Sequence, residues 1–417
     1  MSKNRLFGLP QLSIKVWILA AGRLLSQIGT GFTLFYAPIF FVNEVGLSAV
    51  QVTIGLGTSA SISGVLGRFL GGVFTDSPFW GRRRTLLLSA AISAIADVVF
   101  ALSYDFPTFI IGNLLMGLGI GTYWPATEAA VADLTTIEQR NEAFAITKLA
   151  DNIGLGLGVV LGGVWIGSFG NYRGLFVIDG ISFLLFFVLI YFAIAETYQF
   201  QKNPKQKSSR GWLTALSDRR LIIFLLVNIL FTTYISQVQT TMPLYFKKFV
   251  PAAIGETGFS PQIISLIFSW HVVFSAISQL PVARFLNRFS RPRALIFSLL
   301  CWGIGFYIIW VTGVSGTYSV VWAILALTIL AIATVSYTPS ASALVVDLAP
   351  PQLRGAYLSL NSQCWAIGYL IGPPMGGWAL DISADVAHNF WRAAAVSVIA
   401  GILILQYLDR ILSRRRN

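Results

Sequence analysis

Charged residues are scarce in this chain of 417 residues. Asp, Glu, Lys and Arg make up 11% of the sequence, whereas a soluble domain has about 25%. Hydrophobic residues make up 55%. Water therefore cannot be the main solvent of the folded chain.

Residues that enzymes and metal proteins need are also rare. The two cysteines, Cys301 and Cys364, both lie in apolar segments, so we expect no disulfide framework. The two histidines, His271 and His388, lie in different segments and do not indicate a metal site. No phosphate-binding glycine-rich loop followed by Lys and Ser or Thr occurs, so the chain does not resemble an ATP-driven protein. The sequence predicts neither an enzyme nor a cofactor.

What the sequence does contain is long apolar runs. Each is about 20 residues long, which is enough to cross a hydrocarbon core of about 30 Å. Because a bilayer offers no water to the backbone, we expect these runs to be helices. Strands of a membrane barrel would alternate apolar and polar residues instead. The predicted spans are 16–41, 50–75, 85–102, 108–133, 143–166, 174–193, 221–246, 261–285, 294–312, 319–347, 356–380 and 391–412.

The second half of the chain repeats the first with a constant offset of 214 residues. Of the motif residues between Tyr337 and Gly377, only Pro373 lacks a counterpart, because Val159 stands in its place. We therefore predict an all-α integral membrane protein of twelve transmembrane helices, in two pseudo-symmetric six-helix bundles at 1–198 and 221–417. A polar, Lys-rich linker at 199–220 joins them. The matching residues are Tyr123 and Tyr337, Pro125 and Pro339, Asp133 and Asp347, Leu134 and Leu348, Arg140 and Arg354, Gly154 and Gly368, Gly158 and Gly372, Gly162 and Gly376, and Gly163 and Gly377.

Most of the 29 Lys and Arg residues lie in loops on the side of the amino terminus. The positive-inside rule then predicts that both termini and the linker are cytoplasmic. The net charge of +12 reflects this topology and attraction to anionic membrane lipid, not nucleic-acid binding. The first span is too long, and too far from Met1, to be a cleaved signal peptide. We expect a multi-pass protein of the plasma membrane, which is the inner membrane in a bacterium.

Three motifs give the chain a family resemblance. Residues 72–84 form a loop with Asp76 and a run of Arg, residues 113–121 carry three glycines at alternate positions, and residues 368–377 read Gly-x-x-x-Gly-Pro-x-x-Gly-Gly. With two six-helix halves, these motifs resemble the major facilitator superfamily of transporters. The family's loop is two residues shorter and has an additional Arg, and Asn113 stands where the family has Arg. The Gly-Pro motif is linked to drug/proton antiporters, so the narrower resemblance is to bacterial multidrug-efflux members.

This resemblance implies a monomeric secondary transporter that works by alternating access on a small-molecule substrate. We interpret it as proton-coupled efflux of a small hydrophobic or drug-like compound. An importer or facilitator of a sugar, an organic anion or a lysolipid is an alternative, favoured by Asn113, because the family's Arg at that position is associated with proton coupling. A non-transporting sensor or scaffold is a further alternative, against which the glycine motifs argue.

Ionisable residues inside the spans are energetically unfavourable unless they are paired or face water. Arg23, Glu128, Lys148 and Asp151 are expected at similar depth, in the cytoplasmic-side part of their spans. We predict a buried cluster in which Arg23 pairs with Glu128 or Asp151 and a carboxylate exchanges protons. A permanent structural salt-bridge network is the alternative. Asp97 is more isolated and is expected to make a local structural contact.

Aromatic and amide side chains on several spans suit an apolar substrate cavity, although ordinary helix packing would use the same residues. A histidine inside a span is in addition a candidate proton site, because histidine titrates near neutral pH. The candidate cavity residues are Gln27, Tyr123, Trp124, Tyr234, Gln237, His271, Tyr337 and Trp365.

Charged residues in the cytoplasmic loops are expected to form a gate. One surface ion pair contributes only ~0–1 kcal/mol, but a set of pairs can bias an equilibrium of a few kcal/mol. Asp133 with Arg140, and Asp347 with Arg354, are the pairs suggested by their spacing. Alternatively, the basic loops only fix the topology. The candidate gate residues are Asp76, Arg82, Arg83, Asp133, Arg140, Asp347 and Arg354.

Glycines four residues apart give one helix face a smooth strip that another backbone can approach closely. We predict that the fifth and eleventh helices use these strips to pack against the opposite half and slide, although tight static packing is the alternative. Pro373 is expected to bend the eleventh helix. The residues of the two strips are Gly154, Gly158, Gly162, Gly368, Gly372, Pro373 and Gly376.

Overall fold

The computed structural model describes residues 10–34, 36–48, 51–52, 55, 60–198, 211–253, 256–315 and 318–413. The backbone packs into two compact units. The amino-terminal unit holds the described residues of 10–217 together with Val345–Gln363. The carboxy-terminal unit holds those of 218–344 and 364–413. Residues 50, 53–54 and 56–59 of the predicted span 50–75 and residues 199–210 of the predicted linker lie outside the described residues.

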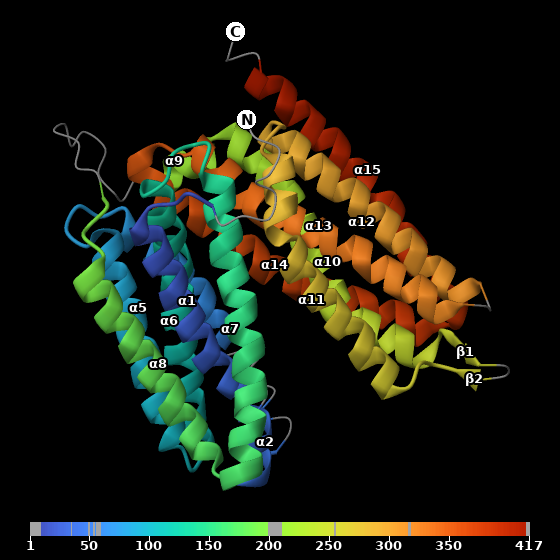
Figure 1. Cartoon of the computed structure of the whole chain (residues 1–417), viewed down its shortest axis with the longest axis horizontal. Helices are drawn as coiled ribbons and strands as arrows, with labels where there is room; N and C mark the ends of the chain where they lie inside the picture. Colours follow the sequence, from blue (N-terminus) through green and yellow to red (C-terminus); the bar gives the residue numbers. More distant parts are fainter. Residues whose placement is uncertain are drawn as a thin grey trace. The chain divides into compact units, whose positions relative to one another are not determined.

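The amino-terminal unit is a bundle of long helices. In Figure 1, α1, α5, α6, α7 and α8 run side by side: α1 packs against α7 and α8, α4 against α6, and α5 against α6 and α8. The helices are α1 (Ile14–Leu34), the short α2 (Ala37–Asn43), α4 (Ala60–Thr75), α5 (Gly81–Ala101), α6 (Phe106–Asp133), α7 (Arg140–Phe169), α8 (Tyr172–Ala193) and the short α9 (Gly211–Ser217).

Polar caps fix several helix ends in this unit. The Asp105 side chain accepts a hydrogen bond from the backbone N–H of Thr108, at 2.9 Å, where α6 begins. The Asn171 side chain does the same for Gly174 where α8 begins, at 3.1 Å. Both contacts satisfy N–H groups that the first turn of a helix leaves unpaired. Gly170 ends α7 with a φ of 62°, which glycine adopts without strain.

The carboxy-terminal unit is also helical. Its α12 packs against α15, and α10 contacts both α11 and α15. One short antiparallel strand pair follows α10, with Pro251 opposite Thr257. The elements of this part of the chain are α10 (Arg219–Lys248), β1 (Pro251–Ala253), β2 (Glu256–Thr257), α11 (Pro261–Leu286), α12 (Arg291–Val314), α13 (Ser319–Leu348), the 3-10 turn η3 (Pro351–Leu353), α14 (Arg354–Ile382) and α15 (Ala384–Ser413). The end of α13, all of η3 and the first turns of α14 fall within Val345–Gln363 and so belong to the amino-terminal unit.

The all-α prediction is confirmed. In the described residues, ten helices are long and apolar enough to cross a membrane. The described part of the second predicted span forms a shorter apolar helix, Ile62–Thr75, and the eleventh span is the 29-residue α14. Helices therefore occur at each of the predicted spans, and α14 runs through Pro373 and Pro374.

The glycine strips lie against helices of their own unit, which differs from the predicted packing against the opposite half. On α7, an added Cβ at Gly154 would come 2.9 Å from the Cβ of Gln27, and one at Gly158 would come 2.8 Å from the Cα of Gly31, both on α1. Because glycines face each other at Gly31 and Gly158, the two backbones approach closely. Gly162 meets the ring of Tyr36.

The strip on α14 faces α10 in the same way. The atoms nearest to Gly368, Gly372 and Gly376 belong to Thr232, Ser236 and Thr241 of α10. Polar side chains of α10 also bond to the α14 backbone: Thr232 Oγ1 donates to the Cys364 carbonyl at 2.7 Å, and Gln237 Nε2 to that of Gly372 at 2.6 Å. The small residues thus let hydroxyl and amide groups reach backbone carbonyls on a neighbouring helix.

Gly158→Leu is expected to lower the melting temperature of the purified protein, because the side chain has no room against α1 and overpacking typically costs about 1–3 kcal/mol. Gly156→Leu on the same helix is the matched control, since nothing lies within 4 Å of an added Cβ there. Thermal unfolding in detergent compares the two variants. Equal melting temperatures for both would show that α1 and α7 do not pack through Gly158.

Candidate functional site

A buried ion pair links α1 to α7. Arg23 Nε donates to Asp151 Oδ1 at 2.8 Å, and Arg23 Nη2 also pairs with Asp151 Oδ2. Both side chains are almost fully buried, at 3% and 5% exposed. Lys148, one turn before Asp151 on α7, places its Nζ 3.9 Å from Asp151 Oδ2. Two cations therefore share one carboxylate in this interior cluster, which we define as Arg23, Lys148 and Asp151.

Helix α6 adds aromatic rings and a second carboxylate to the interior cluster. The guanidinium of Arg23 lies 5.1 Å from the ring centroid of Trp124 and 5.8 Å from that of Tyr123. Lys148 Nζ lies 5.6 Å from the Trp124 ring. Such cation–π contacts are stronger when desolvated. Glu128 acts electrostatically on both cations, so the cluster and Glu128 together hold two cations and two carboxylates.

Stability alone does not account for the interior cluster, because a buried ion pair is often no more stable than well-packed apolar residues. Ionisable groups at membrane depth usually mark substrate or proton paths. Gln27 lies one turn beyond Arg23 on α1, against Gly154 of α7. Of the predicted residues, the structure thus gathers Arg23, Gln27, Tyr123, Trp124, Glu128, Lys148 and Asp151 where α1, α6 and α7 meet.

The predicted cavity residues of the carboxy-terminal unit are packed differently. Tyr234, Gln237 and Tyr337 are each at most 3% exposed. Tyr234 packs on Trp302 and Phe306, with its hydroxyl 2.6 Å from Ser397 Oγ. Burial and a satisfied hydroxyl make Tyr234 a packing residue in this conformation. Gln237 is buried as well: its Nε2 donates to the Gly372 carbonyl, whereas its Oε1 has no hydrogen bond. Both residues depart from the predicted cavity lining.

The remaining candidates of this unit also have contacts within it. Tyr337 donates to Asn228 Oδ1 at 2.6 Å. The Trp365 ring lies 6.4 Å from that of Tyr337. His271 is half-buried on α11, with Nδ1 2.9 Å from the Leu327 carbonyl oxygen. That hydrogen bond fits the packing interpretation of His271.

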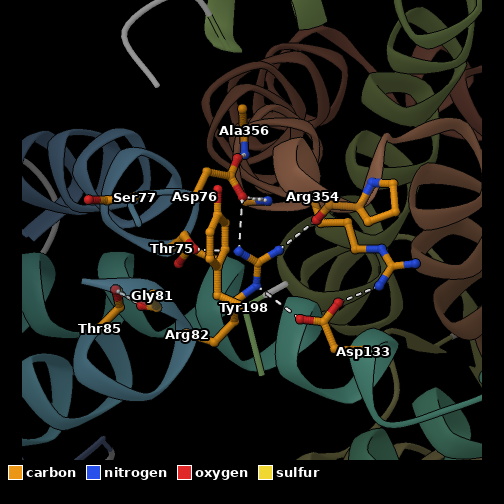
Figure 2. A network of polar contacts seen from close by, with 12 residues as sticks. Thr75, Asp76, Ser77, Gly81, Arg82, Thr85, Asp133, Tyr198, Arg354 and Ala356 are labelled. Atoms are coloured by element: carbon orange, nitrogen blue, oxygen red, sulfur yellow. Dashed lines mark hydrogen bonds and ion pairs between the residues drawn. The ribbon is translucent and has the colours of Figure 1, made fainter. Parts of the chain in front are cut away.

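A second polar cluster lies at the loop ends of the amino-terminal unit and surrounds Arg82, which is 1% exposed (Figure 2). Arg82 Nη1 donates to the Thr75 carbonyl and Nη2 to that of Pro351, both at 2.7 Å. Arg82 Nε donates to Asp133 Oδ2 at 3.0 Å. The Tyr198 ring covers the guanidinium, 4.6 Å away. Arg82 therefore joins the loop after α4, the end of α6 and the turn before α14.

Asp76 caps the beginning of α14. Its Oδ1 accepts from the Gly355 N–H at 2.8 Å and its Oδ2 from the Ala356 N–H at 2.7 Å. These N–H groups carry the positive end of the helix dipole, so a carboxylate is favourable there. Arg82 Nη1 lies 3.6 Å from Asp76 Oδ1. Figure 2 shows Asp76, Arg82, Asp133 and Arg354 converging on this point.

The partners of the other gate residues differ from those suggested by their spacing. Asp133 pairs with Arg354 as well as with Arg82, and Arg140 pairs with Asp347. Each acidic residue thus pairs with the arginine of the other repeat and not with the arginine that follows it in sequence. This exchange is possible because Val345–Gln363 packs with the amino-terminal unit. We define the loop network as Asp76, Arg82, Asp133, Arg140, Asp347 and Arg354.

Arg83 points elsewhere. Its Nη2 donates to the Tyr191 carbonyl at 2.6 Å, and its guanidinium lies 5.0 Å from the Tyr191 ring. Arg83 therefore fastens α5 to α8. The prediction that it takes part in the gate with Arg82 finds no support in these contacts.

Two carboxylates escaped the sequence analysis. Glu196 accepts hydrogen bonds from the backbone N–H groups of Arg82 and Arg83, at 2.9 and 3.1 Å, and so caps the beginning of α5. Glu196 is more than 100 residues away in sequence, so no local motif reveals this cap. Asp179 lies inside the predicted span 174–193. Asp179 could have been found in the same way as Asp97, because each is an ionisable residue inside a predicted span.

Burial raises the pKa of Asp76 to about 7, although Arg82 and the N–H groups of Ala356 and Gly355 oppose the increase. An unfolded Asp has a pKa of about 3.9. The folded protein therefore binds a proton that the unfolded chain releases, and its free energy of unfolding is expected to fall as pH rises from about 4 to about 7. Melting temperatures across this range test the slope. Asp76→Asn should flatten it; an unchanged slope in the variant would assign it to other groups.

Comparisons with known proteins agree with this architecture. A family model described as Major Facilitator Superfamily matches residues 19–250 and 249–416. A Na(+), Li(+), K(+)/H(+) antiporter from Planococcus maritimus is 24% identical over 380 residues, which cover 82% of this chain and 85% of the relative. Multidrug resistance protein MdtH from Salmonella typhimurium is 25% identical over 353 residues, which cover 84% and 82%.

Solved structures share the fold at lower identity. The human organic anion transporter MFSD10 has a TM-score of 0.72 at 18% identity, with 97% of this chain and 100% of that chain covered. A bacterial homologue of the iron transporter ferroportin, in an outward-facing state, has a TM-score of 0.74 at 16% identity, with 95% and 99% covered. These likenesses show the arrangement of the helices.

Proposed function

Because this chain belongs to the major facilitator superfamily, and so is a multi-pass membrane transporter and not an enzyme, we propose that it exports a small hydrophobic or drug-like compound in exchange for protons. It works by alternating access, as a monomer in the bacterial inner membrane with both termini cytoplasmic. The observation that carries this proposal is the interior cluster, where Arg23 and Lys148 share the Asp151 carboxylate.

Asp151 is the proposed proton carrier. While Arg23 makes two contacts with the carboxylate, a proton cannot compete for the same oxygens. Once Arg23 moves away, Asp151 binds one proton from the outside. When Arg23 returns, that proton leaves to the cytoplasm and the substrate leaves in the opposite direction. Glu128 assists in this exchange. Its negative charge stabilises Arg23 or Lys148 when that cation no longer pairs with Asp151.

Trp124 is the proposed link between substrate and proton. Its ring is a contact surface for both Arg23 and Lys148. A lipophilic cation that stacks on this indole displaces a cation of the protein from it, by cation–π attraction and by repulsion of like charge. Substrate binding thereby changes how strongly Arg23 holds Asp151.

The loop network is the proposed cytoplasmic gate. It joins Asp76, Arg82 and Asp133 to the beginning of α14 and the turn before it. One pair alone would be weak, but these side chains are buried and share partners, so breaking them together is cooperative. The gate is closed when the network is intact and opens when Asp133 loses Arg82 and Arg354.

The relatives support both parts of the proposal. The Planococcus maritimus protein is named as an antiporter of monovalent cations and protons, and MdtH is named as a multidrug resistance protein. Proton exchange and a drug-like substrate are the properties that these names suggest for this chain.

A second candidate is an importer or facilitator of an organic anion, a sugar or a lysolipid. Two cations beside one aromatic ring, Arg23 and Lys148 on Trp124, would also bind a negatively charged substrate. In this case the anion takes the place of Asp151 as the partner of Arg23.

Ligand-dependent thermal stability separates the two candidates. A ligand at 100 times its Kd stabilises the folded state by about 2.7 kcal/mol. The efflux proposal expects lipophilic cations to raise the melting temperature, and Glu128→Gln to weaken that response. Stabilisation by organic anions alone, lost in Arg23→Ala, would instead establish the anion transporter.

A further inference from the structure

Two carboxylates meet in the interior of the amino-terminal unit, where α5 packs against α8. Asp97 on α5 and Asp179 on α8 are each 1% exposed. A Cβ added to Gly180 would lie 3.3 Å from the Cβ of Asp97, so Asp97 sits directly beside the residue that follows Asp179. Each carboxylate lies in a helix that is long and apolar enough to cross a membrane.

This pair is separate from the interior cluster. Thr33 of α1 contacts Asp179 and lies ten residues beyond Arg23, which is about 15 Å along a helix that rises 1.5 Å per residue. None of the ion pairs that involve Arg23 or Lys148 among the described residues includes Asp97 or Asp179. The mechanism proposed above makes no use of them.

Hydroxyl groups surround Asp179. Thr33 Oγ1 donates to Asp179 Oδ2 at 2.8 Å, and Ser182 Oγ lies 3.4 Å from Asp179 Oδ1. Gly29 on α1 makes room for this arrangement, because any Cβ there would collide with Ser182 Oγ and Asp179 Oδ1. Two helices, α1 and α8, therefore direct side-chain oxygen atoms toward Asp179.

Asp97 has no such partners. Both of its carboxylate oxygens are buried without a hydrogen bond. Asp179 is the charged group that acts on it, and the groups facing Asp179 are the hydroxyls of Thr33 and Ser182. In the described part of the chain, no Lys or Arg forms an ion pair with Asp97 or Asp179.

Two ionised carboxylates cannot stay together at this depth without a counter-charge. A buried charge is strongly unfavourable unless it is paired, and like charges in one site prevent each other from ionising. A bound cation removes both penalties and supplies the partner that Asp97 lacks. Carboxylate and hydroxyl oxygens are hard ligands, which suit hard cations rather than soft metals, and a carboxylate also binds a proton.

We propose that Asp97 and Asp179, with the hydroxyl oxygens of Thr33 and Ser182, bind a small monovalent cation, either a proton or an alkali-metal ion. The site connects α1, α5 and α8, so cation occupancy changes how strongly these helices hold together. A role of this site in driving transport rests on the function proposed above. Cation binding at the site does not depend on that function.

Thermal stability of the purified full-length protein tests the site. We expect the melting temperature of the wild type to fall as pH rises from 5 to 9 in choline chloride, since the bound proton is lost. A change on the order of 2–4 °C is measurable and corresponds to about 1 kcal/mol for a domain of this size. If alkali-metal ions bind as well, NaCl or LiCl at pH 9 restores the melting temperature; if the site takes only protons, they do not.

Asp97→Asn, Asp179→Asn and the double variant identify the residues. Asp97→Asn should fold, because Asp97 has no hydrogen bond to lose, and Asp381→Asn, at an exposed carboxylate, is the matched control. The pH dependence from Asp76 is common to all four variants and cancels in the comparison with wild type. A wild-type response to pH and salt that persists unchanged in Asp97→Asn and in the double variant would overturn the proposal.

Infrared spectroscopy gives an independent readout. Wild type at pH 5 should show a C=O stretching band of a buried carboxylic acid that shrinks on titration to pH 9 and is weaker in Asp97→Asn. Because buried Asp76 also titrates in this range, the band is read as the difference between wild type and Asp97→Asn. An identical band in the two proteins overturns the site. A wild type that lacks the cation response but keeps substrate-driven proton flux refutes this inference alone, whereas a wild type that binds cations without such flux refutes the proposed transport.

Discussion

Asp151→Asn is expected to abolish proton-coupled transport and to lower the melting temperature by several degrees. The substitution leaves Arg23 buried without the carboxylate that now contacts two of its nitrogens. Removing one partner of a buried ion pair typically costs about 3–5 kcal/mol. The neighbouring Glu128 offsets a part of this loss, because it acts on the same guanidinium. Melting temperature and substrate-driven proton flux are measured on the same preparation.

Two further variants separate stability from coupling. In Arg23→Gln/Asp151→Asn neither charge remains unpaired, so the double variant should recover most of the stability and still fail to couple. Asp381→Asn, at an exposed position, should behave as the wild type. Wild-type flux in Asp151→Asn would refute the role of this carboxylate, whatever the change in melting temperature.

The second large effect is expected for Asp133→Asn, which should break the loop network and open the cytoplasmic gate. Asp133 pairs with both Arg82 and Arg354, and the three side chains are at most 9% exposed. Losing about 3 kcal/mol of interaction would change the ratio of closed to open molecules about 100-fold. A cysteine introduced at Ser359 reports the change, since Ser359 is buried and donates to the Arg68 carbonyl.

Thiol labelling at this position should be much faster in Asp133→Asn than in the parent Ser359→Cys protein. Arg84→Gln, in the first turn of α5, is the control, because Arg84 is exposed. The native cysteines, Cys301 and Cys364, are buried, and their labelling is subtracted with the unmodified protein. Identical labelling rates in the parent and in Asp133→Asn would mean that these ion pairs do not hold the gate.

The sequence was sufficient to predict the helices and a buried cluster in which Arg23 pairs with Glu128 or Asp151. Long apolar runs have few alternatives in a bilayer, and similar membrane depth restricts the partners that an interior charge can find. The choice between Glu128 and Asp151 as the direct partner of Arg23 depended on helix rotation. Only the structure shows how these helices are rotated.

Other features depend on which helices are neighbours. The glycines of α7 predict a smooth face, but not that α1 lies against it. Asp133 and Arg140 are close in sequence, yet each pairs with a residue of the α13–α14 region. Asp97 appeared isolated because its neighbour Asp179 follows only after two intervening helices, α6 and α7. Tyr234 resembled a cavity residue because an aromatic ring suits a cavity and a packed interior equally well.

Proton movement in proteoliposomes tests the central claim most directly. Wild type and Asp151→Asn are reconstituted with a pH-sensitive dye inside, and lipophilic cations, organic anions and sugars are added in turn. We expect a lipophilic cation to trigger proton flux in the wild type and none in Asp151→Asn. Substrate uptake without proton flux, equal in both proteins, would contradict proton-coupled export and leave the interior cluster a structural feature.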